Sequence, residues 1–281
     1  MNLFKTFIIS ILVTGFISCN PNSKSDDTDT LTLLALAWPQ PVSLEFEALA
    51  NGQKITSGSN TLADARTVRF SDFRLFISEI KLIRADGSTS EVSFATDNVW
   101  QSNGVALVDL ETSKTTETNT KVLGTVAPGT YTGIQFTVGV PEALNHLDKN
   151  VQPAPLNVSS MYWAWTSGYK HANIEFSYKN DGTEYTLLHL GSTNCSGAPN
   201  YGNCTKKFRT SVQLTGQINP GNQKISLDVD KLLTGHTYGN MGMCMPGDAA
   251  ATCQPLIRAF GLNDTNGAAD GTYTQRIFSL K

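Results

Sequence analysis

The alternation of apolar and polar residues along this chain predicts β-strands. Residues 42–49 (VSLEFEAL) place Val42, Leu44, Phe46 and Ala48 on one face, which is the pattern of a half-buried strand. Runs rich in β-branched and aromatic residues predict further strands, and these lie at 67–85, 91–95, 104–110, 121–140, 172–190, 206–216 and 223–230.

The longest of these runs, residues 67–85 (TVRFSDFRLFISEIKLIRA), is apolar in both phases. We therefore expect it to bend, to bulge or to form two strands. Asp72 and Arg74 share one face of it, and a structural ion pair is the preferred interpretation of these two charges. Pro-Gly at 127–130 and Asp-Gly at 179–184 predict two hairpins.

Helical patterns are short and few. Residues 141–147 and 230–233 each predict a turn or two of helix. Irregular stretches separate the strands at 141–170, 191–205 and 235–275, and loops on a rigid framework often carry function. The sequence therefore predicts an all-β protein, an antiparallel β-sandwich with long irregular loops and little helix.

Composition agrees with this fold class and limits the kinds of partner. The chain has 281 residues, of which 40% are hydrophobic and 16% charged, enough for a sizeable core. Its net charge of −3 gives no indication of nucleic-acid binding. We expect a single β-sandwich domain over residues 40–281.

The N-terminal residues have the pattern of an export signal. Lys5 supplies a positive charge, and residues 7–18 form an apolar run too short to span a bilayer as a stable anchor. Residues 1–18 are thus expected to be a signal peptide, with Cys19 as the lipid-bearing first mature residue and ordinary signal cleavage as the alternative. Residues 19–39 are expected to be a flexible tether, which predicts a lipid-anchored protein of the periplasm or cell surface.

The other four cysteines form two C-x8-C intervals, Cys195 to Cys204 and Cys244 to Cys253. In an oxidising compartment, four cysteines allow three disulfide connectivities, of which the local one is the simplest. A zinc site made of all four cysteines is less favoured, because these intervals are wider than those of zinc knuckles.

Histidines and methionines offer further candidate metal ligands. None of His146, His171, His189 and His236 lies in an H-E-x-x-H motif. A metal site would therefore need distant segments, and each histidine more often has a structural role. Three methionines flank Cys244, namely Met241, Met243 and Met245. Their thioethers suit Cu(I), although methionines also commonly fill gaps near disulfides.

Residues 161–171 (MYWAWTSGYKH) contain two of the four tryptophans. In an extended conformation, Met161, Trp163 and Trp165 project to one side. Three uses are compatible with such a face: core packing, an exposed stacking platform for a sugar or peptide, and a redox-active pair. The residues alone favour core packing.

Several segments together resemble one family, the MbnP-like periplasmic copper-binding proteins, also described as the four-Cys partner of the metallo-mystery pair. The most specific are W-x-W-x-x-G-Y-K at 163–170, N-H-x-D at 145–148 and H-L-G-S-T-x-C at 189–195. The matching segments follow the family's order over much of 67–263, at 70–82, 133–148, 155–170, 188–197 and 244–263.

This resemblance implies an exported β-sandwich that binds one copper ion and is not itself an enzyme. It also implies a partner, a dihaem cytochrome c peroxidase-like (MbnH-like) protein, which oxidises a tryptophan to kynurenine on which copper binding depends. Trp163 or Trp165 is then the modified residue, and His146, His189 and Asp148 are the candidate copper ligands. Imidazole suits copper in either oxidation state, and a carboxylate favours Cu(II).

A second class of function fits the same aromatic residues. The chain can also be interpreted as a cell-surface binding module, an adhesin or carbohydrate binder that uses an aromatic platform. This reading requires flat tryptophan rings that face solvent. A hydrolytic enzyme has no support, since the sequence contains neither a G-x-S-x-G motif nor a P-loop.

Overall fold

A computed structural model describes residues 38–164, 166–179, 181, 183–198, 200–237, 242–246 and 251–281. The expected signal peptide, the lipidation site Cys19 and most of the expected tether lie outside the described residues, as do Trp165 and Met241. Within the described ranges, no helix has the length and apolar character needed to cross a membrane.

The smaller sheet has the order β17-β15-β1-β9-β6, with β2 paired to β1. The apolar face predicted for residues 42–49 is confirmed, because Val42, Leu44, Phe46 and Ala48 are all buried. The strands are β1 (Gln40–Ala50), β2 (Gln53–Lys54), β6 (Ser93–Phe94), β9 (Lys121–Val126), β15 (Gln223–Asp228) and β17 (Phe278–Leu280).

The larger sheet has the order β14-β10-β4-β12-β13-β16 and carries five short strands beside this path. Its main strands are β4 (Thr67–Ile83), β10 (Tyr131–Val138), β12 (Gly168–Ser177), β13 (Thr186–Gly191), β14 (Thr210–Ile218) and β16 (Gly242–Cys244). The short strands are β3 (Ser59–Thr61), β5 (Thr89–Glu91), β7 (Gln101–Ser102), β8 (Val105–Asp109) and β11 (Tyr162–Ala164).

Strand β4 explains why residues 67–85 are apolar in both phases. It is one strand with two irregularities, a register shift against β12 next to Phe70 and another against β10 near Glu79, whose φ is 53°. Each shift moves the core-facing positions into the other phase. The main core accordingly takes Phe70 before the first shift, Phe73 to Ile77 at odd positions, and then Ile80 and Leu82.

All-β architecture is confirmed, but the sheets are mixed rather than purely antiparallel. Strands β1 and β15 pair in parallel, and so do β13 and β16. Both pairs join strands far apart in the sequence, so no tight turn forces an antiparallel arrangement. The strand predicted at 91–95 also divides, because β5 pairs with β4 while β6 pairs with β9 of the other sheet.

One predicted hairpin is confirmed and the other is wrong. Residues 179–184 connect β12 to β13, which pair antiparallel. Residues 127–130 instead connect β9 of the smaller sheet to β10 of the larger one. A Pro-Gly turn fixes a local reversal, but it does not decide whether the strands that follow pair with each other.

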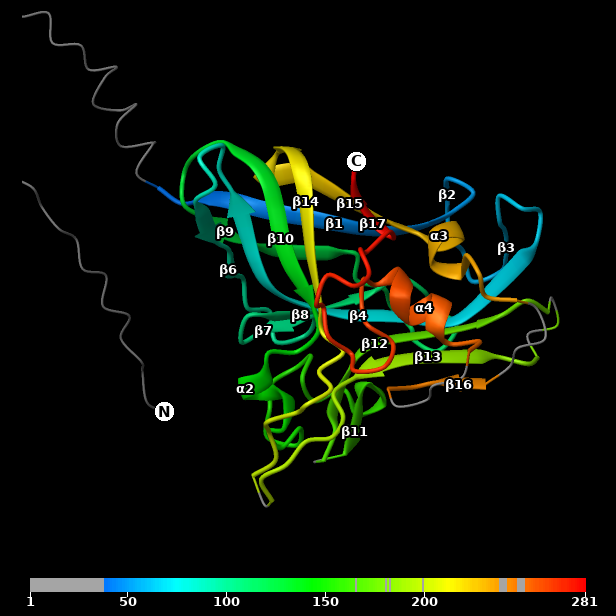
Figure 1. The fold of residues 1–281 in the computed structure, drawn as a ribbon. Helices are drawn as coiled ribbons and strands as arrows, with labels where there is room; N and C mark the ends of the chain where they lie inside the picture. The colour runs from blue at the N-terminus through cyan, green and yellow to red at the C-terminus, as the bar shows by residue number, and fades with distance from the viewer. Residues whose placement is uncertain are drawn as a thin grey trace, which may run out of the picture. The chain divides into compact units, whose positions relative to one another are not determined.

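The described helices are short, and two of them were predicted. They are α2 (Glu142–Asn145), α3 (Val229–Leu233), α4 (Gln254–Ala259) and the 3-10 turns η1 (Ser159–Met161) and η2 (Pro220–Asn222). Helix α4 lies in a stretch expected to be irregular. Figure 1 shows α2 and β11 together below the sheets. A second apolar cluster fixes this region, and it consists of Phe76, Val105, Leu107, Val140, Leu156, Met161 and Tyr169.

Candidate metal centre

His189 lies on β13, in register with Asn173 of β12. Residues two apart on a strand point to the same face, so Glu175 projects on the same side of β12 as Asn173. His189 is 5% exposed, and its Nε2 lies 3.1 Å from Glu175 Oε1. The pairing of β12 with β13 therefore brings a buried imidazole against a carboxylate.

Glu175 is held as an anion. Burial opposes its ionisation, but hydrogen bonds from His189 and Lys114 outweigh that effect and lower the pKa of Glu175 to about 2. Lys114 reaches the second carboxylate oxygen from the loop after β8. An ionised Glu175 accepts a hydrogen bond from Nε2–H of His189, and in the neutral form of the ring this leaves the lone pair on Nδ1.

His189 Nδ1 is the atom that points to a ligand. It is buried and has no hydrogen-bond partner among the described residues, whereas buried polar atoms are normally paired. Metal-binding histidines commonly donate their other ring N–H to a carboxylate, which fixes the ring and its tautomer. The Glu175–His189 pair thus fits one half of a metal site, with Nδ1 as the ligand atom.

Trp163 lies beside this histidine. The centroids of the two rings are 6.5 Å apart and their planes are inclined by 51°. Strand β11 brings Trp163 there by pairing with β12, Tyr162 opposite Tyr169. Gly191 makes room for the indole, since a Cβ on Gly191 would lie 2.5 Å from Trp163 Cζ3.

The expected Met161–Trp163 face is only partly formed. Met161 closes the 3-10 turn η1 and is fully buried in the second apolar cluster, where Tyr162 also packs. Strand alternation begins only after that turn, so Met161 and Tyr162 both contact the cluster. Trp163 instead lies beside His189 and over Gly191. The prediction that this stretch packs into the core is therefore correct for Met161 and wrong for Trp163.

A buried ion pair on β4 connects the strands that carry Glu175 and Trp163. Arg74 Nε donates to Asp72 Oδ1 at 2.7 Å, and Asp72 Oδ2 accepts from Asn173 at 2.7 Å. Arg74 also donates to Ser160 Oγ at 2.8 Å, in the turn that precedes β11. The predicted structural ion pair therefore links β4, β12 and the segment that carries Trp163.

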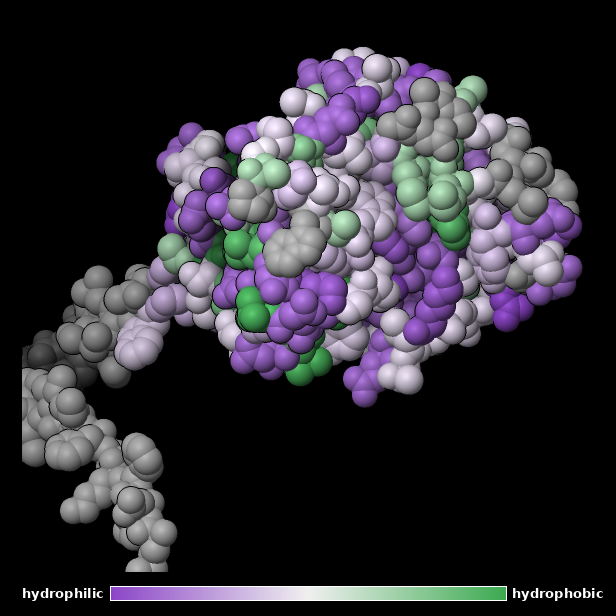
Figure 2. Space-filling model, turned by 90° about the horizontal axis from the view of Figure 1, so that it is seen from below, coloured by the Kyte–Doolittle hydropathy of each residue, from purple (hydrophilic) through white to green (hydrophobic). Residues whose placement is uncertain are grey.

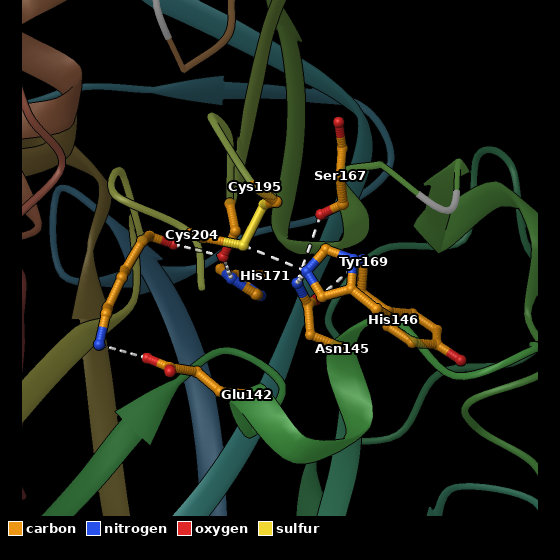
Figure 3. The surroundings of a disulfide bond; sticks show 10 residues. Glu142, Asn145, His146, Ser167, Tyr169, His171, Cys195 and Cys204 are labelled. Atoms are coloured by element: carbon orange, nitrogen blue, oxygen red, sulfur yellow. Dashed lines mark hydrogen bonds and ion pairs between the residues drawn. A yellow bond between two sulfur atoms is a disulfide. The ribbon is translucent and has the colours of Figure 1, made fainter. Parts of the chain in front are cut away.

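His146 lies in a different environment, shown in Figure 3. It follows α2, and its Nε2 is 3.1 Å from Cys204 Sγ and 3.1 Å from Asn145 Nδ2. His146, Cys195 and Cys204 offer ligand atoms that all lie within 4.8 Å of one another. Across the described ranges, this is the one group of three or more such side chains, and His189 is not in it.

Asp148 has a local role. Its Oδ1 accepts hydrogen bonds at 2.9 Å from the backbone N–H and from the side chain of Asn150, as in a turn capped by an aspartate. The three ligands expected from the sequence thus have different partners: His189 has Glu175 and Trp163, His146 has the disulfide, and Asp148 has its own turn.

The remaining histidines are buried. His171 Nδ1 accepts from the Val140 backbone N–H at 3.3 Å, and its Nε2 is 3.1 Å from Ser192 Oγ. Burial, with Arg209 adding repulsion, lowers the pKa of His171 to about 3. His236 stacks on Tyr178, 3.1 Å from its hydroxyl. Both rings are neutral parts of the packing.

Sequence reasoning missed Glu175, and it weighed Met243 only as a possible soft ligand. Glu175 stands between Ile174 and Phe176 in a strand with an apolar face, and a charged residue in mid-strand is a usable signal. Met243 is in register with Leu187 on β13, so it lies on the face that also carries His189. It is 53% exposed and offers a soft thioether.

Both disulfides join the near neighbours, Cys195 to Cys204 and Cys244 to Cys253. This confirms the local connectivity and excludes the four-cysteine zinc site. The first disulfide closes the loop after β13 beside His146. The second joins β16, the strand next to β13, to the start of α4.

Comparison with known proteins agrees with this arrangement. The model of the MbnP family matches residues 39–246. The chain belongs to the MbnP family. Among solved structures, the chain is similar to MbnP from Methylosinus trichosporium, with 23% sequence identity, a TM-score of 0.71, and coverage of 87% of this chain and 99% of that one. At that identity the likeness shows a shared fold. A search of curated proteins gives no match.

Proposed function

We propose that this MbnP-family chain is an exported copper-binding protein that acts in copper acquisition or handling. His189 Nδ1 would supply one ligand, Glu175 would fix the ring, and Met243, on the same face of the sheet, would add a soft ligand. The observation that carries the proposal is the buried, unpartnered Nδ1 beside Trp163. Imidazole and thioether together suit copper, and the thioether favours Cu(I).

The proposal includes modification of a tryptophan. A dihaem cytochrome c peroxidase-like partner would use two equivalents of peroxide to oxidise Trp163 to kynurenine, which opens the indole, releases one ring carbon as formate and exposes an aniline nitrogen and a carbonyl. Trp163 is preferred to Trp165 because its ring contacts His189, so new polar atoms would arise next to the ligand. The chain is then a substrate of its partner and a carrier of copper rather than a catalyst.

Attachment to the membrane through a lipid on Cys19 completes the proposal. Residues 19–39 would then serve as the tether between that anchor and the domain. Replacement of Cys19 with Ser, expressed with the natural signal, should move the chain from the membrane fraction to the soluble fraction. A chain that stays membrane-bound after this change would contradict lipid anchoring.

Trp163 does not resemble an exposed platform, because its ring is half-buried and packs against Gly191. The face drawn in Figure 2 is mostly hydrophilic or neutral, and its apolar residues form small separate patches. The partial burial of Trp163 favours the copper site over the adhesin or carbohydrate binder, because a stacking platform needs a flat ring that faces solvent.

Co-expression with the haem partner tests the proposal. The purified chain should contain one copper ion, and peptide mass spectrometry should locate the modification at Trp163. His189→Ala should remove the copper, whereas His146→Ala, the matched histidine variant outside this site, should retain it. A chain that contains no copper and has both tryptophans intact would refute the proposal.

A further inference from the structure

Apart from the proposed copper site, the structure contains a second arrangement of ligand-type side chains. We propose that Cys195, Cys204 and His146 form a redox-gated site that binds Zn(II) when the disulfide is reduced. The oxidised form carries no thiolate and cannot bind this ion. The inference does not depend on copper binding at His189.

Geometry supports the ligand set. The two sulfurs and an imidazole nitrogen lie within 4.8 Å of one another. Two cysteines and one histidine are a known zinc ligand set with one open position. His146 and Cys195 are half-buried while Cys204 is buried, so an ion can reach the site from solvent.

The hydrogen bonds around Asn145 determine the tautomer of His146, whose Nε2 lies 3.1 Å from Cys204 Sγ (Figure 3). Asn145 Oδ1 accepts from the Tyr169 backbone N–H at 3.0 Å, which fixes the orientation of the amide. Asn145 Nδ2 therefore donates to His146 Nε2, so this nitrogen is unprotonated. On binding, the metal takes this lone pair, and Asn145 keeps its hydrogen bond to Ser167 O.

Backbone hydrogen bonds would hold the loop in place without the disulfide. Ser196 and Gly202 exchange two backbone hydrogen bonds of 2.9 Å inside it, and Thr193 and Lys206 form a second bridge outside it. These bridges flank the two cysteines on both sides. Reduction would therefore leave two thiols side by side, already arranged for a metal.

Opening the site requires a dithiol reductant, such as a thioredoxin-like C-x-x-C protein. Its thiolate attacks the more exposed Cys195 Sγ, and Cys204 leaves as a thiolate beside His146. The second thiol of the reductant then releases Cys195 and closes the reductant's own disulfide. Two electrons and two protons pass to the chain, and Zn(II) binding displaces the thiol protons.

Zinc titration of the full chain, reduced without oxygen by a phosphine and followed against a chromophoric chelator, tests the proposal. The reduced chain should bind one more Zn(II) than the oxidised chain, and His146→Ala should weaken that binding by at least about tenfold. A Cys195→Ser/Cys204→Ser variant should lose it. The Cys244–Cys253 pair is the matched control, because it has the same spacing and, among the described residues, no histidine that forms a ligand group with it.

The Cys244→Ser/Cys253→Ser variant should therefore keep the extra Zn(II). Cadmium in place of zinc should give a thiolate charge-transfer absorption in the reduced chain. In His146→Ala the same absorption should appear, but only at a higher cadmium concentration than the wild type needs. Three results would each overturn the proposal: no extra Zn(II) after reduction, equal affinity in His146→Ala, or circular dichroism showing that reduction unfolds the chain.

Discussion

Trp163 and His189 lie side by side on the polar face of β12 and β13, with 6.5 Å between their ring centroids. Neither residue's position follows from its neighbours in the sequence. Trp163 is carried by β11 and His189 by β13, and both flank β12. A change in the indole ring would therefore act directly on the environment of the proposed copper ligand.

Gly191 should be essential for this contact. In Gly191→Ala, the new methyl group would lie 2.5 Å from Trp163 Cζ3 and 2.8 Å from the backbone oxygen of Tyr169, so both the indole and the β12 backbone must move, with a cost of about 1–3 kcal/mol in the free energy of unfolding. We expect less modified tryptophan and less copper after co-expression with the haem partner. Gly242→Ala is the control, because its added methyl group would meet no atom within 4 Å. Equal copper in both variants would contradict this account.

Glu175 should tune copper affinity through His189. Glu175→Gln keeps the size of the side chain but replaces the anion that holds the imidazole ring, and loss of such a partner typically lowers metal affinity by about 10–100-fold. Lys114→Met removes the ion pair to the other carboxylate oxygen while leaving the His189 contact, so its effect should be smaller. Competition with a Cu(I) chelator measures both, and an unchanged affinity in Glu175→Gln would remove Glu175 from the site.

His171 should make the fold sensitive to acid. Its pKa is about 3 in the folded chain, against 6.5 ordinarily. As the pH falls below 6.5, the unfolded chain takes up a proton that the folded chain does not, so stability decreases toward pH 3. The slope for one such group is about 1.4 kcal/mol per pH unit.

The variant His171→Gln isolates this effect. It should be less stable at pH 8, because the bonds to Val140 and Ser192 are altered, but its unfolding free energy should fall less steeply between pH 6.5 and 4. Urea unfolding across this range gives the two slopes. Parallel curves for wild type and variant would show that His171 is not the responsible group.

Asp109 should destabilise the fold at neutral pH. It is paired opposite Arg74 on β4, and burial, with a contribution from Asp72, raises its pKa to about 6. A raised carboxyl pKa means that ionisation above pH 6 costs folding free energy, and that this cost declines as the pH falls through 6 toward 4.

Asp109→Asn should therefore raise the unfolding free energy at pH 8, by about 3 kcal/mol if the whole pKa shift is recovered. The gain should become smaller at pH 5, where the wild-type carboxyl is largely protonated in the folded chain. Thermal or urea unfolding at the two pH values measures it. A variant that is less stable at both would show that the Arg74–Asp109 attraction outweighs burial.

Much of the framework was predictable from local patterns. The apolar face of β1, the hairpin at 179–184 and the ion pair between Asp72 and Arg74 follow from the period-two pattern and the turn residues. The turn at 127–130 was misassigned as a hairpin, because turn chemistry reverses the chain without choosing the sheet that the next strand joins. The two phases of β4 were visible in sequence, but the positions of its irregularities depend on its neighbours β10 and β12.

The sequence by itself determined the strands, the local disulfide connectivity as the simplest choice, and a family resemblance that the family match confirms. Only the tertiary structure decided which candidate ligands lie together. His146 and His189 looked equivalent in sequence, yet one contacts a disulfide and the other a carboxylate and an indole. The reason is physical: strand pairing joins residues that are distant in the chain, and the burial and charge at each histidine come from those partners rather than from sequence neighbours.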